Sequence, residues 1–349
     1  MDGVSETTDE LRRGRESYAK RAWLDAFTAL GEADRATPLE SDDLELLATS
    51  ASMVGRMDDY LALLERAHLA RVERGENLAA ARNAVWLGMT LATRGDVGPA
   101  SGWFARSRRL VEREGRDCVE QGWLRVPEAF QALFMGQYEA AHESAVVAVG
   151  YAERFRDPDL AAVALYMQGM SRIKQAVMDE GLRLLDEAMV GITADAVSPV
   201  LTGIVYCGVI ATCEEAFEAR RAQEWTSALT RWCDAQPQMV SFSGRCLAHR
   251  AGIMQRHGAW RDALEEARLA RVRCEEAMNQ AAAGEALYQQ GELHRLQGDS
   301  DAAEAAYREA SQFGREPQPG LALLRLAQGD VGAAKAAIGR VLGESSELL

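Results

Sequence analysis

Residues 281–310, AAAGEALYQQGELHRLQGDSDAAEAAYREA, contain two stretches of small and apolar residues separated by Gly298 and Asp299. Glycine commonly ends a helix in a left-handed conformation, and aspartate commonly caps the start of the next one. The first stretch carries Gly291 twelve residues before Ala303, and a tyrosine follows Ala303 by four residues. The sequence therefore predicts two helices joined by a short turn at the Gly-Asp dipeptide.

The same pattern occurs nine times along the chain. It consists of a residue that is usually small, an apolar residue four positions later and usually another small residue three positions after that. Successive copies are 34, 40, 41, 40, 41, 41, 40 and 31 residues apart. The first members are Ala26, Tyr60, Ala100, Ala141, Gly181, Ala222, Ala263, Ala303 and Ala334. A period this regular is typical of a solenoid, in which each unit packs on its neighbours.

Each unit resembles a tetratricopeptide repeat, in which small residues let two helices approach closely and a bulky residue fills the groove. The chain is 48% hydrophobic and has only 8 prolines, which favours long helices and no β-sheet. We predict an all-α fold, a tetratricopeptide-like right-handed superhelical solenoid with a repeat of about 40 residues. Residues 1–349 are expected to form one domain of eight helix-turn-helix units and a partial ninth, whose first helix runs from Gly320 to Gln328.

Two local features refine this prediction. The unit at residues 198–237 departs from the pattern, because it lacks a Gly-Asp turn and carries two tryptophans instead. Asp96, Asp299 and Asp330 each follow a glycine at a helix junction. Aspartate at such a position favours a helix N-cap, so we predict caps there and not general bases.

Several longer segments resemble a known family. They are LLERAHLARVERGENLAAARNAVWLG, ASGWFARSRRL, DEGLRLLDEAMVGITADAVSP, GIVYCGVI, EWTSALTRWCDAQP, HGAWRDALEEA, YQQGELHRLQGD and EPQPGLALLRLAQGD. From about residue 15 to about residue 340 the chain is similar to the tetratricopeptide (MalT-like) sensor region of actinobacterial LuxR-type transcriptional regulators. The resemblance implies a region that receives a small molecule or a protein, while a C-terminal helix-turn-helix domain acts on DNA. The sequence offers no basic recognition helix, so the chain is either a fragment of a longer regulator or a stand-alone relative.

Composition and motifs exclude several classes of function. A formal net charge of −14 argues against contact with nucleic acid, whose phosphates need clustered Lys and Arg. No apolar segment approaches the roughly 20 residues of a membrane helix. The six cysteines, and the histidines His249, His257 and His294, lack metal-ligand spacing, and no nucleophile or phosphate-binding motif occurs. We therefore predict a cytoplasmic, non-catalytic protein without a metal or cofactor, contacting neither membrane nor nucleic acid.

The expected ligand surface is the concave face of the solenoid. In a repeat of this type, the residues six and three positions before the small residue of the first helix, and one and four after it, point inward. Counting the sixth unit from Gly208, we predict ligand contacts at Arg82, Met89, Trp123, Phe130, Tyr166, Met170, Val205, Arg245, Tyr288 and Glu292. The middle of this surface is apolar, aromatic and rich in methionine, which suits an adaptable pocket with a few polar anchors. Of the seven tryptophans, only Trp123 is predicted to contact ligand, and the other six are predicted core residues.

The predicted occupant is an apolar or aromatic small molecule or an amphipathic helix. The alternative is that a tightly wound superhelix buries these residues as ordinary core. The leading functional hypothesis is a ligand-sensing solenoid in transcription regulation, in which binding shifts the superhelix between two curvatures. The alternatives are a stand-alone protein that sequesters an apolar compound, for antibiotic self-resistance or as a carrier, and a protein–protein adaptor. A homodimer is predicted through the apolar C-terminal unit.

Overall fold

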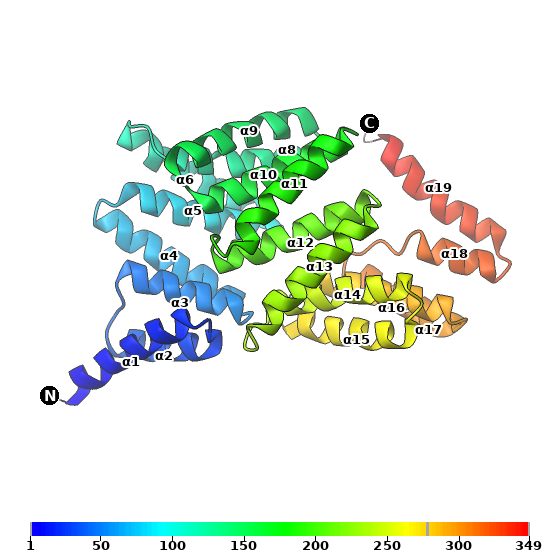
Figure 1. Ribbon diagram of the computed structural model, residues 1–349, viewed down its shortest axis with the longest axis horizontal. Coiled ribbons are helices and arrows are strands. Elements are labelled where there is room, and N and C mark those ends of the chain that lie inside the picture. The colour runs from blue at the N-terminus through cyan, green and yellow to red at the C-terminus, as the bar shows by residue number, and fades with distance from the viewer. Residues whose placement is uncertain (1, 277–278, 348–349) are drawn as a thin grey trace. The chain divides into compact units, whose positions relative to one another are not determined.

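The computed structural model describes residues 2–276 and 279–347 (Figure 1). Within these residues all regular secondary structure is α-helical, as the sequence predicts. The helices are α1 (Asp2–Ala19), α2 (Trp23–Ala36), α3 (Ser41–Met53), α4 (Met57–Glu73), α5 (Asn77–Thr93), α6 (Val97–Glu114), α7 (Glu120–Trp123), α8 (Arg125–Phe134), α9 (Tyr138–Phe155), α10 (Pro158–Lys174), α11 (Met178–Thr193), α12 (Pro199–Glu215), α13 (Ala219–Asp234), α14 (Ser243–Arg256), α15 (Trp260–Glu276), α16 (Gln280–Leu296), α17 (Ser300–Gln312), α18 (Gly320–Ala327) and α19 (Val331–Glu347).

The helices of the described residues form nine successive helix-turn-helix pairs, one for each copy of the sequence pattern. The first member of each copy lies on the second helix of its pair, from Ala26 in α2 to Ala334 in α19. The last pair has the predicted short first helix, the 8-residue α18. In the fourth pair the first helix is divided into α7 and α8, since Pro127 lacks the N–H that would bond to the carbonyl of Trp123.

A close approach between the two helices of a pair holds the repeat together. At Gly88 in α5, an added Cβ would lie 2.6 Å from Cδ1 of Phe104 in α6, so only glycine fits. The same relation joins Gly291 in α16 to Tyr307 in α17, where an added Cβ would lie 2.5 Å from Cε1. These contacts confirm the predicted fit of a bulky side chain against a small residue sixteen positions earlier in the sequence.

The turns within the pairs place one residue in the left-handed backbone region. Glycine takes this conformation at several turns, as in Gly136 with a φ of +71° and Gly298 with a φ of +82°. The predicted caps are confirmed at Asp299 and Asp330, whose carboxylates accept hydrogen bonds from the backbone N–H groups three residues later. The cap predicted at Asp96 is wrong, because its side chain makes no such hydrogen bond.

The described chain divides into two compact units, residues 1–238 and residues 239–349. Unit 1 contains α1 to α13, and unit 2 contains α14 to α19. The boundary falls at the end of the repeat whose sequence departs from the pattern, although the period itself continues into unit 2. The prediction of one continuous solenoid domain stays a prediction, and each unit is described by itself.

Unit 1 closes on itself, because its first helix pair contacts the end of its sixth. The indole Nε1 of Trp23 donates a hydrogen bond to Oε1 of Gln236 at 2.9 Å, and both side chains are buried. The amide of Gln238 accepts from the backbone N–H of Leu24 at 3.0 Å. Polar groups 213 and 214 residues apart are thus paired, so the six helix pairs form one closed turn.

Replacing Gly88 with alanine should destabilise unit 1 by about 1–3 kcal/mol, because the new methyl group overlaps the Phe104 ring. Gly102 in α6 is the matched control, since an added Cβ there meets nothing within 4 Å. Gly102→Ala should raise stability by about 0.5–1 kcal/mol through helix propensity. Denaturant unfolding followed by circular dichroism measures both effects, and equal stabilities of the two variants would contradict the close-approach account.

Replacing Gln236 with leucine should also destabilise unit 1, by about 1–3 kcal/mol, because it leaves the buried N–H of Trp23 without an acceptor. The control is Gln223→Leu, at an exposed position of α13, the helix that precedes Gln236. Thermal unfolding monitored by tryptophan fluorescence should show a lower midpoint for Gln236→Leu only. An unchanged midpoint would show that the first and sixth pairs do not depend on this bond.

Candidate functional site

Four of the predicted ligand contacts are half-buried apolar or aromatic side chains in unit 1. They are Met89 in α5, Phe130 in α8, and Tyr166 and Met170 in α10, and we call them the inner stripe. The hydroxyl of Tyr166 lies 3.6 Å from the sulfur of Met170. An added Cβ on Gly208 in α12 would lie 2.5 Å from the Tyr166 hydroxyl, so the ring packs directly on that helix. The inner stripe therefore continues onto α12.

Arg82 and Trp123, two other predicted contacts, are engaged with each other. Trp123 is only 2% exposed, and its Nε1 donates to Oδ2 of Asp157 at 3.0 Å. The Arg82 guanidinium lies 5.3 Å from the centre of the Trp123 ring and pairs with Asp157 and Glu120 at 3.2 and 3.0 Å. Both polar groups of this pair have partners within the fold. We therefore assign Trp123 to the core and not to a ligand surface.

Two of the tryptophans predicted to be core residues differ from expectation, whereas a third does not. Trp23 is fully buried, as predicted for a core residue. Trp260 is 37% exposed and Trp225 is half-buried, so neither belongs to the interior of a helix pair. Because all tryptophans are large and apolar, their residue type does not separate the buried Trp23 from the partly exposed Trp225 and Trp260.

Val205 is fully buried, so it offers no surface to a ligand. The reason is that Gly208 is not the small position of the sixth pair. That position lies twelve residues before Ala222 and is occupied by Ile210. Counting inward positions from Ile210 selects Ile204, which is 39% exposed. The small positions of the two helices of a pair are separated by a constant twelve residues, and this separation would have identified Ile204 from the sequence.

Polar groups that the sequence analysis left out occupy the inward positions of the first two pairs. Tyr18 in α1 hydrogen bonds to Thr49 in α3, and Nη2 of Arg71 lies 3.0 Å from the carboxylate of Glu45. Burial raises the pKa of Glu45, although Arg71 opposes this shift. Burial also raises the pKa of Asp159 at the start of α10. Applying the inward positions to the first two repeats would have identified Tyr18, Glu45 and Thr49.

The three predicted contacts in unit 2 do not form a comparable stripe. Arg245 is exposed, whereas Tyr288 is 8% exposed and accepts a hydrogen bond from the backbone N–H of Gly320. Burial raises the pKa of Tyr288 to about 12. Glu292 pairs with Arg295 at 2.7 Å and accepts a hydrogen bond from the hydroxyl of Tyr307. Tyr288 and Glu292 therefore hold unit 2 together.

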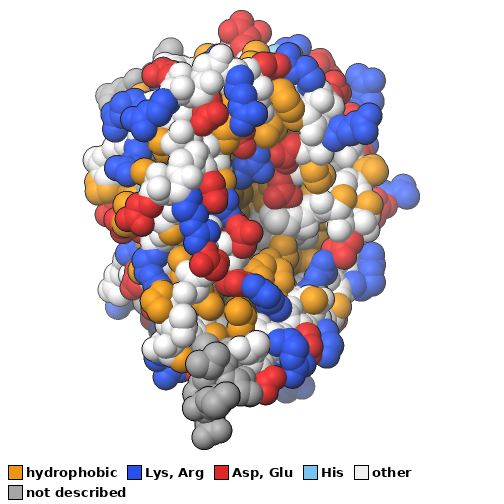
Figure 2. All heavy atoms as spheres, turned by 90° about the vertical axis from the view of Figure 1, so that its left-hand side faces the viewer, with side chains coloured by type: hydrophobic (Ala, Val, Ile, Leu, Met, Phe, Trp, Pro, Cys, Tyr) orange, Lys and Arg blue, Asp and Glu red, His pale blue; other side chains and the backbone are white. Residues whose placement is uncertain are grey.

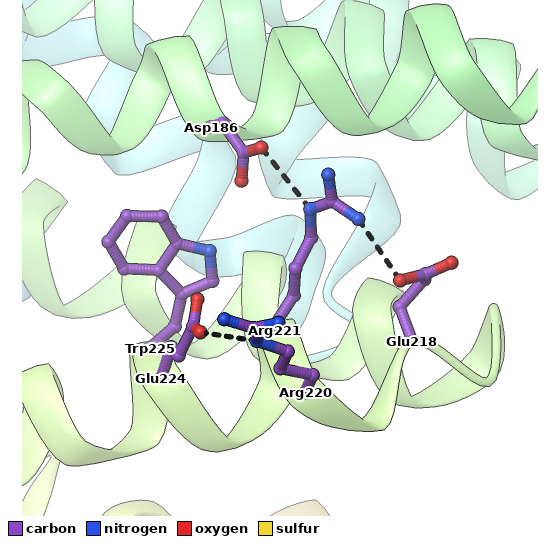
Figure 3. A pocket seen from close by; sticks show the side chains of 6 residues that line it. All are labelled: Asp186, Glu218, Arg220, Arg221, Glu224 and Trp225. Atoms are coloured by element: carbon purple, nitrogen blue, oxygen red, sulfur yellow. Dashed lines mark hydrogen bonds and ion pairs between the residues drawn. The ribbon is translucent and has the colours of Figure 1, made fainter.

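A cleft of about 420 Å³ lies between α11 and α13 of unit 1 (Figure 3). Arg221 crosses it, donating to Asp186 at 3.2 Å and to Glu218 at 3.0 Å. Trp225 forms one wall, and its buried Nε1 has no hydrogen-bond partner. The carboxylates of Asp186, Glu218 and Glu224 in this cleft are all paired with arginines, and Trp225 supplies its aromatic wall.

Unit 2 has an apolar groove of about 280 Å³ between α18 and α19. Leu323, Leu326 and Val331, three of its lining residues, are 43 to 61% exposed. The groove lies in the C-terminal unit, where the sequence predicts a homodimer contact.

In residues 2–276 and 279–347 no group of His, Cys, Asp and Glu side chains is arranged to hold a metal ion. Five of the six cysteines are buried and all six are free thiols. No helix of the described chain is both long and apolar enough to cross a membrane.

Figure 2 shows that the face at the left of Figure 1 is hollowed near its centre, with charged side chains of both signs around the hollow.

The helix pairs, their close contacts and their left-handed turns define a tetratricopeptide-like helical solenoid. The sequence matches no known family and no curated protein. The structure is similar to that of a signal transduction ATPase with numerous domains from Pyrococcus horikoshii, which has a tetratricopeptide repeat sensor. The two are 12% identical over 94% of this chain, with a TM-score of 0.55.

The crystal structure of the apo form of RapI is also similar, at 11% identity, over 93% of this chain and 99% of that chain, with a TM-score of 0.44. This chain spans only 52% of the Pyrococcus protein. Likeness at such low identity shows the fold and leaves the function open. The relation to LuxR-type regulators stays a prediction.

Proposed function

We propose that this chain is a non-catalytic binding module whose unit 1 holds an apolar or aromatic small molecule on the inner stripe. The observation that carries the proposal is that Met89, Phe130, Tyr166 and Met170, at predicted inward positions of unit 1, are only partly buried. Ordinary core residues of this size are buried completely, as Leu160 and Leu185 are in the same unit.

The chemistry of the inner stripe suits such a ligand. Methionine side chains are flexible and polarizable and adapt to irregular apolar shapes, and aromatic rings add stacking surface. The polar groups nearest in the repeat order are Glu45 in the second pair, which is paired with Arg71, and Arg82 in the third pair, which is paired with Glu120. Binding pockets generally combine a mostly apolar lining with a few polar groups of this kind.

The role that we propose for binding is regulatory. A ligand between the repeats changes the preferred curvature of a helical solenoid if it binds one curvature more tightly than the other. The resemblance to sensor regions of LuxR-type regulators supports a place in transcription control in the cytoplasm. Sequestration of an apolar compound is the alternative, since it needs the same site without a second curvature, and an amphipathic helix from a partner protein would use the same stripe.

Native mass spectrometry of the protein purified from its own host tests the proposal, followed by denaturation to identify any released molecule. Phe130→Ala should weaken retention of that molecule about 10-fold or more, because a buried phenyl ring contributes about 1.5–3 kcal/mol. Met170→Ala should weaken it to a similar extent. Phe134→Ala is the matched control, since Phe134 lies one turn further along α8 and is 85% exposed.

Two outcomes would contradict the proposal. One is a protein that carries no molecule and binds none of a panel of hydrophobic metabolites by titration calorimetry. The other is a bound molecule whose retention falls equally in Phe130→Ala and Phe134→Ala. If the protein retains a molecule but its small-angle X-ray scattering profile is the same with and without that molecule, sequestration is favoured over regulation by curvature.

A further inference from the structure

Four carboxylates from three helix pairs of unit 1 gather around the guanidinium group of Arg82. Its Nη2 lies 3.0 Å from Glu120 in α7, and its Nη1 lies 3.2 Å from Asp157 at the start of α10. Arg82 also interacts electrostatically with Glu45 in α3 and with Asp159 in α10. We call Glu45, Glu120, Asp157 and Asp159 the carboxylate cluster.

Asp159 is the member of the carboxylate cluster that has no cation of its own. It takes part in none of the ion pairs between described residues, and its Oδ1 accepts a hydrogen bond from the backbone N–H of Ser198 at 2.7 Å. Burial raises the pKa of Asp159, and the attraction to Arg82 does not cancel this shift. The charge of Asp159 is therefore incompletely compensated by the groups of the chain.

Glu45 is also incompletely compensated. Nη2 of Arg71 lies 3.0 Å from Glu45, but the same nitrogen lies 3.0 Å from the exposed Asp42. The side-chain nitrogen of Asn83 lies against the Glu45 carboxylate and has no hydrogen-bond partner, although Asn83 is only 4% exposed. A buried donor without an acceptor costs free energy. An unused donor and an incompletely compensated carboxylate thus lie side by side, which indicates a polar partner that the chain itself does not supply.

Tyr18, at the end of α1, interacts electrostatically with both Glu45 and Asp159. The two carboxylates therefore lie near one point inside unit 1, although they are more than 100 residues apart in the sequence. Arg21, the cation that acts on Tyr18, pairs with Asp195. A single added cation at this point would interact with both carboxylates.

The carboxylate cluster and the inner stripe occupy the same faces of two helices. In α10, Asp159 precedes Tyr166 by seven residues, and in α5, Arg82 precedes Met89 by seven residues. Seven residues are nearly two turns, so each pair of side chains shares a face and is separated by about 10 Å along the helix axis. Unit 1 therefore presents a negatively charged region about 10 Å from an apolar one.

We propose that the molecule held on the inner stripe is a cationic amine, whose ammonium group binds between Asp159 and Glu45. This inference rests on the proposed function and deepens it by naming the charge of the ligand. An ammonium group donates charge-assisted hydrogen bonds to carboxylates and supplies the missing positive charge. An anionic ligand would instead add to the excess of negative charge, and a neutral one would leave Asp159 uncompensated. A hydroxyl oxygen next to the amine would accept the unused N–H of Asn83.

Three probes with the same apolar part test the charge of the ligand. They are 6-phenylhexylamine, 6-phenylhexan-1-ol and 6-phenylhexanoic acid, whose extended hexyl chain spans about the distance between the two regions. Titration calorimetry at neutral pH should show that the amine binds at least about 10-fold more tightly than the alcohol and that the acid binds most weakly. Adding a hydroxyl group, as in 1-amino-6-phenylhexan-2-ol, should tighten binding of the amine, and Asn83→Ala should remove this gain.

The ratio of amine affinity to alcohol affinity locates the anchor. Asp159→Asn should lower this ratio about 10-fold, because asparagine keeps the acceptor for Ser198 and removes the charge. Asp179→Asn is the matched control at the exposed start of α11 and should leave the ratio unchanged. Phe130→Ala should weaken binding of both probes and also leave the ratio unchanged, because the phenyl ring contacts only their apolar part.

The outcomes separate this inference from the function on which it rests. Equal affinities of the amine and the alcohol, or a ratio that persists in Asp159→Asn, would overturn the inference while the apolar site stands. Tightest binding of the acid would overturn it as well and would assign the anchor to Arg82. If no probe binds, or if Phe130→Ala changes neither affinity, the proposed function fails and the inference fails with it.

Discussion

The close approach of two helices at one small residue is the constraint on which this structure depends. Where Gly88 meets Phe104 and Gly291 meets Tyr307, no side chain larger than hydrogen fits. The contact fixes the relative rotation of the two helices of a pair, and thereby which positions of the first helix point inward. Because the separation of twelve residues is kept from repeat to repeat, the same inward positions recur along each unit.

The sequence was sufficient to predict the helices, the pairing and the turns, since these depend on contacts between residues near one another in the chain. It was not sufficient for side chains whose surroundings come from distant repeats. Trp123 is buried because Asp157, from the next pair, accepts its N–H. Val205 was misplaced because Gly208 was mistaken for the small position, whereas this glycine makes room for Tyr166 of the preceding pair. The sequence shows the same residue type, glycine, at a close contact within a pair and at a close contact between pairs. Only the residue that packs against the glycine distinguishes the two kinds of contact.

The candidate site has an apolar side, which was predicted from the sequence, and a polar side, which was not. The inner stripe was predicted from Met89, Phe130, Tyr166 and Met170, because their residue types are unusual at helix positions facing inward. The polar groups of the first two pairs escaped notice because Glu45 resembles any solvated helix residue in sequence. Burial distinguishes it, because Arg71 and Asn83, from the next two helices, lie against its carboxylate.

The bond between Trp23 and Gln236 also changes the way in which unit 1 can come apart. An ordinary solenoid loses its terminal repeats first, because each repeat is held only by its neighbour. A ring has no terminal repeat, so the first and sixth helix pairs protect each other from fraying. Unit 1 should therefore exchange its amide hydrogens in one cooperative opening, and its assembly must wait until residues more than 200 positions apart have met, which slows folding.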